Sequence, residues 1–414
     1  MPKNLVIFED KGFENLLPLT YTRPACMLRC GILTLAEKII KAYKPDKVTI
    51  HTRDYLAGHL AESLPEASIN EFASEDTLLI NGRIVASKDL AKAIPMEGKD
   101  AAYVKDGEVV AARISGSKMK EIVGLLGKGS LKDGWAKDLP KQDIDQVLIQ
   151  YPWDLVTHNK EEIVNDFENM EVWGRIEGEV HSSVILANKD NIYIGKGAKI
   201  QPGAILMAEE GPIYIDSNAV VMAGAVLEGP IAVGRKSRIK MLAKIYEGTS
   251  IGEYCKIGGE VEESIFQGYT NKQHDGFLGH SYLGEWINLG ADTNNSDLKN
   301  NYSPVKVTIN GKEIDSENLF VGLIMGDHSK TGINTMFNTG TVVGVGCNIY
   351  GGDFPPKYLP SFMWGNSKKM KEHDFKKFLQ TTERVLTRRD KKLTPNTKEM
   401  LQKVFDLTKK ERKR

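Results

Sequence analysis

The chain has 414 residues, more than one ordinary domain holds, so we expect two or three domains. Lys and Arg number 55 and Asp and Glu also number 55, so net charge gives no reason to expect nucleic acid or an anionic membrane as a partner. Four cysteines without CxxC or zinc-type spacing indicate a reducing compartment. The N-terminus lacks the order of a signal peptide, and no apolar run approaches the roughly 18 residues of a membrane span. We therefore expect a soluble, cytoplasmic protein.

The beginning of the chain alternates apolar strands with amphipathic helices. We expect strands at 3–8, 47–51 and 77–80, helices at 32–43 and 56–64, and an antiparallel hairpin around Asp106-Gly107. This order is typical of a mostly parallel α/β sheet. The stretch 120–146, rich in Lys, Gly and Asp, is interpreted as an excursion or a loop, and the domain is expected to end near Phe167.

From about Met170 an aliphatic residue returns at every sixth position. The strictest run is Ile215, Val221, Leu227, Val233, Ile239, Ile245, Ile251 and Ile257. A period of six fits neither a helix nor a strand alone, but it fits a short strand followed by a turn of fixed length. Each unit would add one strand to a wall of a prism and point its aliphatic side chain inward. The repeat predicts a parallel β-helix; the alternative is scattered core aliphatics in an ordinary α/β domain.

The repeat is then interrupted. It slips by two residues, and the expected core positions after the slip are Ile265, Phe277, Leu283 and Leu289, with Asn271 in the missing slot. The segment 292–318 breaks the pattern entirely. Interruptions of a solenoid concentrate on binding faces, so residues 269–302 are where we expect the chemistry.

The end of the chain is basic. Residues 368–414 hold 17 Lys and Arg against 7 Asp and Glu, in two helical stretches separated at Thr394-Pro395. A Lys-rich helix is usually a solvated face, and the alternative is that this tail contributes charge to a binding site. The expected domains are 1–167, 168–366 and 367–414.

Residues 279–302, GHSYLGEWINLGADTNNSDLKNNY, resemble the acetyltransferase site of the bifunctional bacterial family that makes UDP-N-acetylglucosamine, a cell-envelope precursor. Residues 321–344 are similar to coils of archaeal sugar-1-phosphate nucleotidyltransferases. The resemblance implies a Rossmann-like nucleotidyltransferase domain followed by a left-handed β-helix, in a homotrimer. It also implies the activity: acetylation of glucosamine-1-phosphate with acetyl-CoA, then coupling of N-acetylglucosamine-1-phosphate to UTP with release of pyrophosphate.

Acetyl transfer to an amine needs a group that removes a proton, and histidine suits that task near neutral pH. By the family motif GHxxYLG, His280 is the matching general base; the alternative is a surface histidine on a coil edge. The resemblance assigns contacts with the sugar phosphate to Lys240, Tyr282, Asn288, Asn301 and Tyr302. Expected contacts with acetyl-CoA are Ala291, Lys306 and Lys330. The interval from His280 to Asn288 is one hexad shorter than in the common bacterial form, which rotates the residues after it by one prism wall.

Nucleotidyl transfer needs amides or cations on the phosphates and carboxylates that hold Mg²⁺. Residues 5–38 keep the family's Pro-Leu-Thr but lack most of its phosphate-loop glycines. The expected nucleotide-binding residues are Arg23, Arg29, Asn81 and Gly82. The expected metal ligands are Glu9, Asp10 and Asn159. Two carboxylates beside a triphosphate repel it unless a metal intervenes, so Glu9 and Asp10 either hold Mg²⁺ or mark an inactive site.

Three interpretations of the whole chain remain open. The first is the bifunctional enzyme, and the second is an enzyme with one active domain, either the acetyltransferase or the sugar-1-phosphate nucleotidyltransferase. The third is a regulatory or assembly subunit without activity. His280 with its neighbouring polar residues favours an enzyme, whereas the missing glycines keep the single-activity interpretation open.

Overall fold

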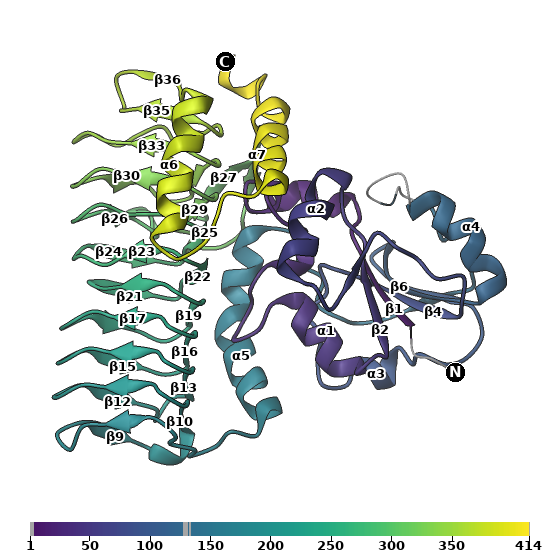
Figure 1. Ribbon diagram of the computed structural model, residues 1–414, viewed down its shortest axis with the longest axis horizontal. Coiled ribbons are helices and arrows are strands. Elements are labelled where there is room, and N and C mark those ends of the chain that lie inside the picture. Colours follow the sequence, from purple (N-terminus) through teal and green to yellow (C-terminus); the bar gives the residue numbers. More distant parts are fainter. Residues whose placement is uncertain (1–3, 127–130, 132–133, 414) are drawn as a thin grey trace.

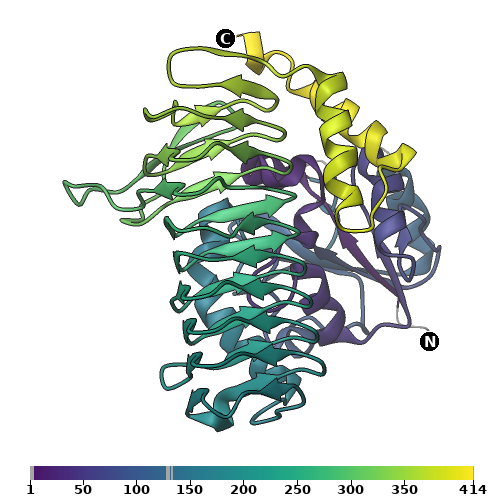
Figure 2. The same ribbon diagram turned by 60° about the vertical axis from the view of Figure 1, so that its left-hand side comes forward.

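The computed structural model describes residues 4–126, 131 and 134–413. An α/β domain lies beside a long prism of stacked short strands, and two C-terminal helices lie against the end of the prism where the last strands are (Figure 1). Figure 2 shows the same stack from a second direction, with the helices again alongside its last coils. No helix among the described residues is long and apolar enough to cross a membrane.

A seven-stranded sheet forms the centre of the first domain, in the order β3-β2-β1-β4-β6-β5-β7. The strands are β1 Asn4–Phe8, β2 Lys47–Ile50, β3 Ser68–Ile69, β4 Thr77–Asn81, β5 Ala101–Lys105, β6 Glu108–Ile114 and β7 Lys141–Asp143. Strands β1, β2 and β4 are parallel, and β5 and β6 form the expected antiparallel hairpin. The predicted α/β class is confirmed.

Five helices accompany this sheet: α1 Leu35–Tyr43, α2 Asp54–Ser63, α3 Leu90–Ala93, α4 Gly116–Leu126 and α5 Pro152–Met170. Helix α1 begins where Thr34 and Glu37 form a reciprocal capping box, which satisfies amides at its first turn. The predicted loop at 120–146 is wrong in part, because this stretch contains the end of α4 and strand β7. Residues 127–130 and 132–133 of that loop lie outside the described residues.

The prism has three walls of parallel strands. The first wall consists of β10 Ile192–Ile194, β13 Ile213–Ile215, β16 Ile231–Val233, β19 Thr249–Ile251, β22 Ile265–Gly268, β25 Tyr282–Glu285, β29 Leu323–Met325, β32 Thr341–Val343 and β34 Tyr358–Leu359. The second wall consists of β8 Glu179–Val180, β11 Lys199–Ile200, β14 Val220–Val221, β17 Arg238–Ile239, β20 Lys256–Ile257, β23 Asn271–Lys272, β30 Lys330–Thr331, β33 Asn348–Ile349, β35 Met363–Gly365 and β36 Met370–Glu372, the last antiparallel.

The third wall consists of β9 Ile185–Ala187, β12 Ile205–Met207, β15 Val226–Glu228, β18 Lys244–Ile245, β21 Glu260–Glu262, β24 Phe277–Gly279, β26 Asn294–Asn295 and β31 Met336–Phe337. A hairpin of β27 Lys306–Ile309 and β28 Lys312–Asp315 leaves the prism within the segment predicted to break the repeat. The predicted β-helix is confirmed.

The strict hexad fills the core of the prism. All eight aliphatic residues from Ile215 to Ile257 are between 0 and 2% exposed. The phase predicted after the slip is partly wrong, since Phe266 and Leu278 occupy the core in place of Ile265 and Phe277. The slot assigned to Asn271 holds a lysine instead. The ammonium group of Lys272 lies buried there, 2.9 Å from the carbonyl oxygen of Gly258, which shows how a turn of unusual length shifts the pattern by one residue.

The outer face of the first wall is apolar and packs against the first domain. Leu19 and Trp153 meet Tyr282 and Ile324 in one buried cluster, so the prism and the α/β domain share a core. The C-terminal helices, α6 Phe375–Thr387 and α7 Pro395–Leu407, form a second shared cluster with α2 and the last coils. The basic tail is therefore packed onto the body of the protein. The domain limits at 167 and 366 stay proposals: α5 crosses the first, and β36 lies just beyond the second.

Candidate functional site

His280 lies on a prism edge, where the chain turns from the third wall (β24) to the first wall (β25). Its φ of 45° is in the left-handed region, as a sharp corner requires. The backbone is held from both neighbouring coils, because His280 N–H donates to the Glu262 carbonyl and its own carbonyl accepts from Gly322 N–H at 2.8 Å. The corner thus projects the imidazole outward from a rigid support.

Two carboxylates from adjacent coils face the two nitrogens of this imidazole. Nδ1 lies 2.8 Å from Oδ2 of Asp297, and Nε2 lies 3.4 Å from Oε2 of Glu263. Phe320 stacks on the ring with the centroids 4.8 Å apart. The side chain of His280 is 14% exposed, so the group is sheltered but open to solvent on one side.

Burial opposes protonation of His280, but hydrogen bonds and negative charge from Asp297 and Glu263 outweigh it and raise the pKa of the imidazole to about 9. With that pKa, roughly 1% of the imidazole is neutral at pH 7. The pairing with Asp297 fixes the ring orientation and leaves Nε2 as the nitrogen that can exchange a proton with a bound ligand. The cluster therefore has the composition of an oriented acid–base group whose neutral form increases with pH.

Gly279 is needed where it stands, directly before His280. A Cβ built on Gly279 would lie 2.2 Å from Oδ2 of Asp297, which is closer than any side chain permits. Asn295 reinforces the same corner, since its amide accepts from Gly279 N–H and donates to the Gly279 carbonyl, each at 3.0 Å. The motif glycine thus makes room for the carboxylate that contacts His280.

The α/β domain has a second candidate place for chemistry. Ligands of open α/β sheets bind beyond the carboxyl ends of strands at the switch point of the topology, which here lies between β1 and β4. Glu9 and Asp10 follow β1, but both are taken by arginines: Arg53 Nε lies 2.9 Å from Glu9 and Arg83 Nη2 lies 2.7 Å from Asp10. These ion pairs leave almost no free volume in the crevice.

The comparisons with known proteins agree with this two-part architecture. Residues 5–172 match the model of a family described as sugar nucleotidyl transferase. The bifunctional protein GlmU of Methanocaldococcus jannaschii is 39% identical over 198 residues, which are 48% of this chain and 42% of that protein. The bifunctional sugar-1-phosphate nucleotidylyltransferase/acetyltransferase of Sulfurisphaera tokodaii is 35% identical over 106 residues, 25% of this chain and 26% of that protein. Over these stretches the chain is similar to the bifunctional GlmU proteins.

The predicted resemblance is thereby confirmed, although the matched stretches span less than half the length of these GlmU-type relatives. The activity and substrates of this chain are accordingly matters for proposal. Among solved structures, a UDP-N-acetylglucosamine acyltransferase of Francisella novicida covers 57% of this chain and 77% of its own, with 14% identity and a TM-score of 0.32. We draw no conclusion from a likeness at that score.

Several residues assigned by resemblance to the GlmU family serve the interior of this protein instead. Tyr282, predicted to contact the sugar phosphate, is 0% exposed, and its hydroxyl accepts from Arg29 N–H and donates to Gln267 at 2.7 Å. Arg23, predicted to bind nucleotide, is buried in an ion pair with Asp327. Both predictions are wrong in this geometry, because each polar group is already used to join the two domains.

The predicted metal set is also wrong. Asn159 lies in the domain interface, where its amide accepts from Gly31 N–H and donates to the Gly248 carbonyl, each at 2.7 Å, and it is not joined to Glu9 and Asp10. Among the described residues, no group of three or more His, Cys, Asp and Glu side chains is arranged to hold a metal. The donor set therefore does not fit Mg²⁺ in this conformation, since arginines neutralise both carboxylates.

Of the remaining residues predicted to bind nucleotide, two lie in the crevice and one lies outside it. Asn81 and Gly82 do lie in the crevice, where the Asn81 amide donates to Asp10 at 2.8 Å. Arg29 lies away from it: its guanidinium bonds the Ile32 carbonyl, and it lines a larger cavity of about 730 Å³ between the domains and the C-terminal helices.

The other predicted acetyltransferase residues lie around two different prism edges. Asn301 and Tyr302 occupy the exposed loop after Asp297, and Tyr302 is 71% exposed. Lys240 and Ala291 lie at turns between the second and third walls, and Asn288 pairs with Lys330 on the second wall. Lys306 lies on the protruding hairpin, 3.5 Å from Glu313. Within one chain, His280 therefore lies at the edge between the third and first walls, whereas Asn288 lies on the second wall. This separation agrees with the short interval between them in the sequence.

Asp297 and Glu263 are site residues that the sequence motif does not predict. Each belongs to a coil next to that of His280, so only the three-dimensional stacking places them beside it. The sequence does hold one signal for Glu263, because it lies at the turn one coil before His280. That position can be recognised only when the slip in the repeat has been placed correctly.

Proposed function

We propose that the prism transfers the acetyl group of acetyl-CoA to the amine of glucosamine-1-phosphate, with His280 as general base. The observation that carries the proposal is the imidazole of His280 held between Asp297 and Glu263 beside the motif shared with the GlmU family. The amine nitrogen attacks the thioester carbonyl, the carbon–sulfur bond breaks, and a proton passes from the nitrogen to Nε2 of His280. The CoA thiolate then takes up a proton and leaves.

Asp297 positions His280 in this scheme. Its contact with Nδ1 keeps Nε2 directed at the substrate and stabilises the imidazolium that forms. Glu263 faces the same Nε2, so a bound sugar ammonium group would compete with the imidazole for this carboxylate. That competition lowers the pKa of His280 in the complex and increases its neutral fraction.

A homotrimer would complete this site. Large apolar side chains are exposed along both edges of the third wall: Leu319 and Phe320 on the edge that carries His280, and Leu242 and Ile333 on the edge next to the second wall. In a cyclic trimer with the third walls facing one another, the His280 edge of one copy would contact the other edge of the third wall of the next copy. Such a heterologous contact would bury the exposed apolar residues of both edges. It would also bring Lys240 and Ala291 of one copy, which lie at the edge between the second and third walls, toward His280 of the next.

We further propose that the first domain couples N-acetylglucosamine-1-phosphate to UTP. The match of residues 5–172 to the sugar nucleotidyl transferase family supports this activity. The Arg53–Glu9 and Arg83–Asp10 ion pairs favour the second candidate, an acetyltransferase whose first domain is inactive, because they occupy the crevice where the triphosphate would lie.

Two assays distinguish these candidates. Thiol release from acetyl-CoA with glucosamine-1-phosphate tests the prism, and pyrophosphate release from UTP with N-acetylglucosamine-1-phosphate, with and without added Mg²⁺, tests the first domain. Both signals are expected for the bifunctional enzyme, and the first alone for the single-activity candidate. Absence of thiol release from correctly assembled protein contradicts the proposal for the prism. Pyrophosphate release alone would then leave the sugar-1-phosphate nucleotidyltransferase, and absence of both signals would leave a non-enzymatic subunit.

A further inference from the structure

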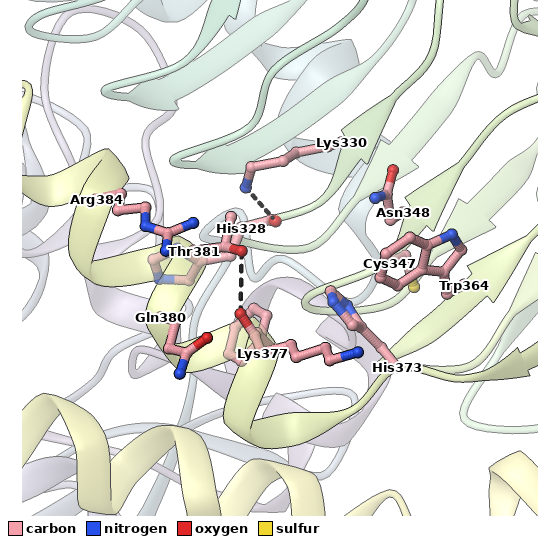
Figure 3. Close-up of a pocket in the computed structure, with 11 residues that line it drawn as sticks. His328, Lys330, Cys347, Asn348, Trp364, His373, Lys377, Gln380, Thr381 and Arg384 are labelled. Atoms are coloured by element: carbon pink, nitrogen blue, oxygen red, sulfur yellow. Dashed lines mark hydrogen bonds between the residues drawn. The ribbon is translucent and has the colours of Figure 1, made fainter.

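A cavity of about 300 Å³ lies between the second wall of the prism and α6 (Figure 3). His280 lies at the edge between the third and first walls. The cavity lies at the other edge of the first wall, where it meets the second wall, next to the turn that joins β29 to β30. Helix α6, which the proposed acetyl transfer does not use, forms its outer side. His280, Glu9 and Asp10 are not among its lining residues.

The wall side of the cavity is a column of residues in register. Lys330 pairs with Asn348, and Asn348 pairs with Trp364, on successive parallel strands. Residues paired in this way project from the same face of a sheet, so the three side chains stand one above another. Figure 3 shows them approaching the cavity from the strands.

The other side of the cavity is a single face of α6. Lys377, Gln380, Thr381 and Arg384 line it, with the three-, four- and seven-residue spacing that puts side chains on one stripe of a helix. This stripe is polar and basic, whereas Phe378 and Leu386 on the same helix are buried against the body of the protein. Helix α6 therefore presents cations to the wall while its apolar positions anchor it.

The lining is rich in cations and contains no Asp or Glu. Its cations are Lys330, Lys377 and Arg384, and the other lining residues are neutral, including His328 and His373, whose pKa values burial lowers. Burial lowers the pKa of Lys330 to about 8, and no carboxylate offsets that effect. Cations gathered without a counter-charge repel one another, so the arrangement favours a bound anion.

His328 adds a second indication. It is 5% exposed, and its Nδ1 has no hydrogen-bond partner among the described residues. Burial lowers its pKa to about 3, so the ring is neutral and one of its nitrogens carries a hydrogen. Buried polar atoms without partners are rare and costly, and they are often found where a ligand completes the hydrogen bonding.

We propose that this cavity binds the phosphate group of a small phosphorylated ligand, held by Lys330, Lys377 and Arg384. The amide groups of Asn348 and Gln380 are placed to bond the remaining oxygens or the rest of the ligand, whereas the Thr381 hydroxyl already donates to the Lys377 carbonyl at 3.0 Å. The volume is at the lower end of that of small-molecule sites, which suits a sugar phosphate better than a whole dinucleotide. The site does not include His280.

Calorimetric titration of the full chain tests the proposal with three separate probes: inorganic phosphate, glucosamine-1-phosphate and 3′,5′-ADP. Lys377→Gln and Arg384→Gln remove one cation each from exposed positions of α6, and Lys376→Gln removes the same charge from a neighbouring residue that does not line the cavity. Each lining variant is expected to weaken binding of at least one probe about 10-fold, the usual effect of losing a charge-assisted hydrogen bond. The control is expected to change it less than 2-fold.

The probes identify the source of the phosphate. A loss confined to inorganic phosphate or glucosamine-1-phosphate assigns the cavity to a small ligand, and a loss confined to 3′,5′-ADP assigns it to the phosphorylated end of CoA. Equal affinities of the wild-type protein, both lining variants and the control for every probe would overturn the proposal, as would no measurable binding of any probe. Thermal unfolding of each variant verifies that α6 remains in place.

Discussion

Arg23 of the first domain and Asp327 of the prism form a buried two-point ion pair, with Nη1 3.0 Å from Oδ1 and Nη2 2.6 Å from Oδ2. Thr22 donates a further hydrogen bond of 2.8 Å to the same carboxylate, and Glu285 lies 3.4 Å from the guanidinium. The pair lies beside the apolar core shared by the two domains. It therefore sets how the α/β domain is seated on the prism.

Removing one partner of this pair is expected to destabilise the whole protein. Asp327→Ala leaves the buried guanidinium of Arg23 without its main counter-charge, at a cost of about 3–5 kcal/mol in the free energy of unfolding. Urea denaturation monitored by tryptophan fluorescence measures it. Glu66→Ala, which removes an exposed carboxylate from the first domain, serves as control and should change the free energy by less than about 0.5 kcal/mol. A cost for Asp327→Ala equal to that of the control would contradict the structural role of the pair.

Gly279→Ala tests the packing at the corner that carries His280. The added methyl group displaces Asp297, which frees His280 to adopt other orientations, so kcat for acetyl transfer should fall at least 10-fold. Gly352→Ala is the matched control, because a Cβ there meets nothing within 4 Å. If both variants retain the wild-type kcat, the proposed contact between Asp297 and His280 is not needed for turnover.

The pH dependence of acetyl transfer should follow the titration of His280. A base acts when it is neutral, so kcat/KM should rise with pH, reach half of its plateau at the free-enzyme pKa of about 9 and level off above it. Asp297→Asn and Glu263→Gln each remove a negative charge that raises this pKa, so each should move the rising limb to lower pH. Asp297→Asn should also lower the plateau, because the ring loses its orienting partner. If the rising limb of the kcat/KM profile stays at the same pH in both variants, a group other than His280 controls the pH dependence.

The sequence predicts the prism well because the hexad is a local pattern. From Ile215 to Ile257 every expected core residue is buried, since each position depends only on the strand and turn that contain it. The pattern fails after Ile257, where shortened turns put the next core residues at Val261 and Phe266, and Phe266 takes the place expected for Ile265. Nothing in the local sequence indicates how long such a turn is.

The candidate site is predictable only in part. His280 stands in a continuous motif and can be identified from it, but Asp297 and Glu263 come from neighbouring coils. Polar residues expected to touch ligands, such as Arg23 and Glu9, instead pair with residues far away in the sequence. A charged side chain that binds a ligand and one that binds a distant segment look the same in a sequence, because the partner decides the role.

The measurement that tests the account most directly is thiol release from acetyl-CoA in the presence of glucosamine-1-phosphate, comparing the wild-type protein with His280→Gln. The wild-type protein is expected to release CoA at a rate that depends on the sugar phosphate. In the variant kcat should fall by about 10²- to 10⁴-fold, the usual contribution of a general base, while thermal stability and any pyrophosphate release from UTP remain. A His280→Gln rate within threefold of wild type would contradict the assignment of His280 as the base of an acetyltransferase.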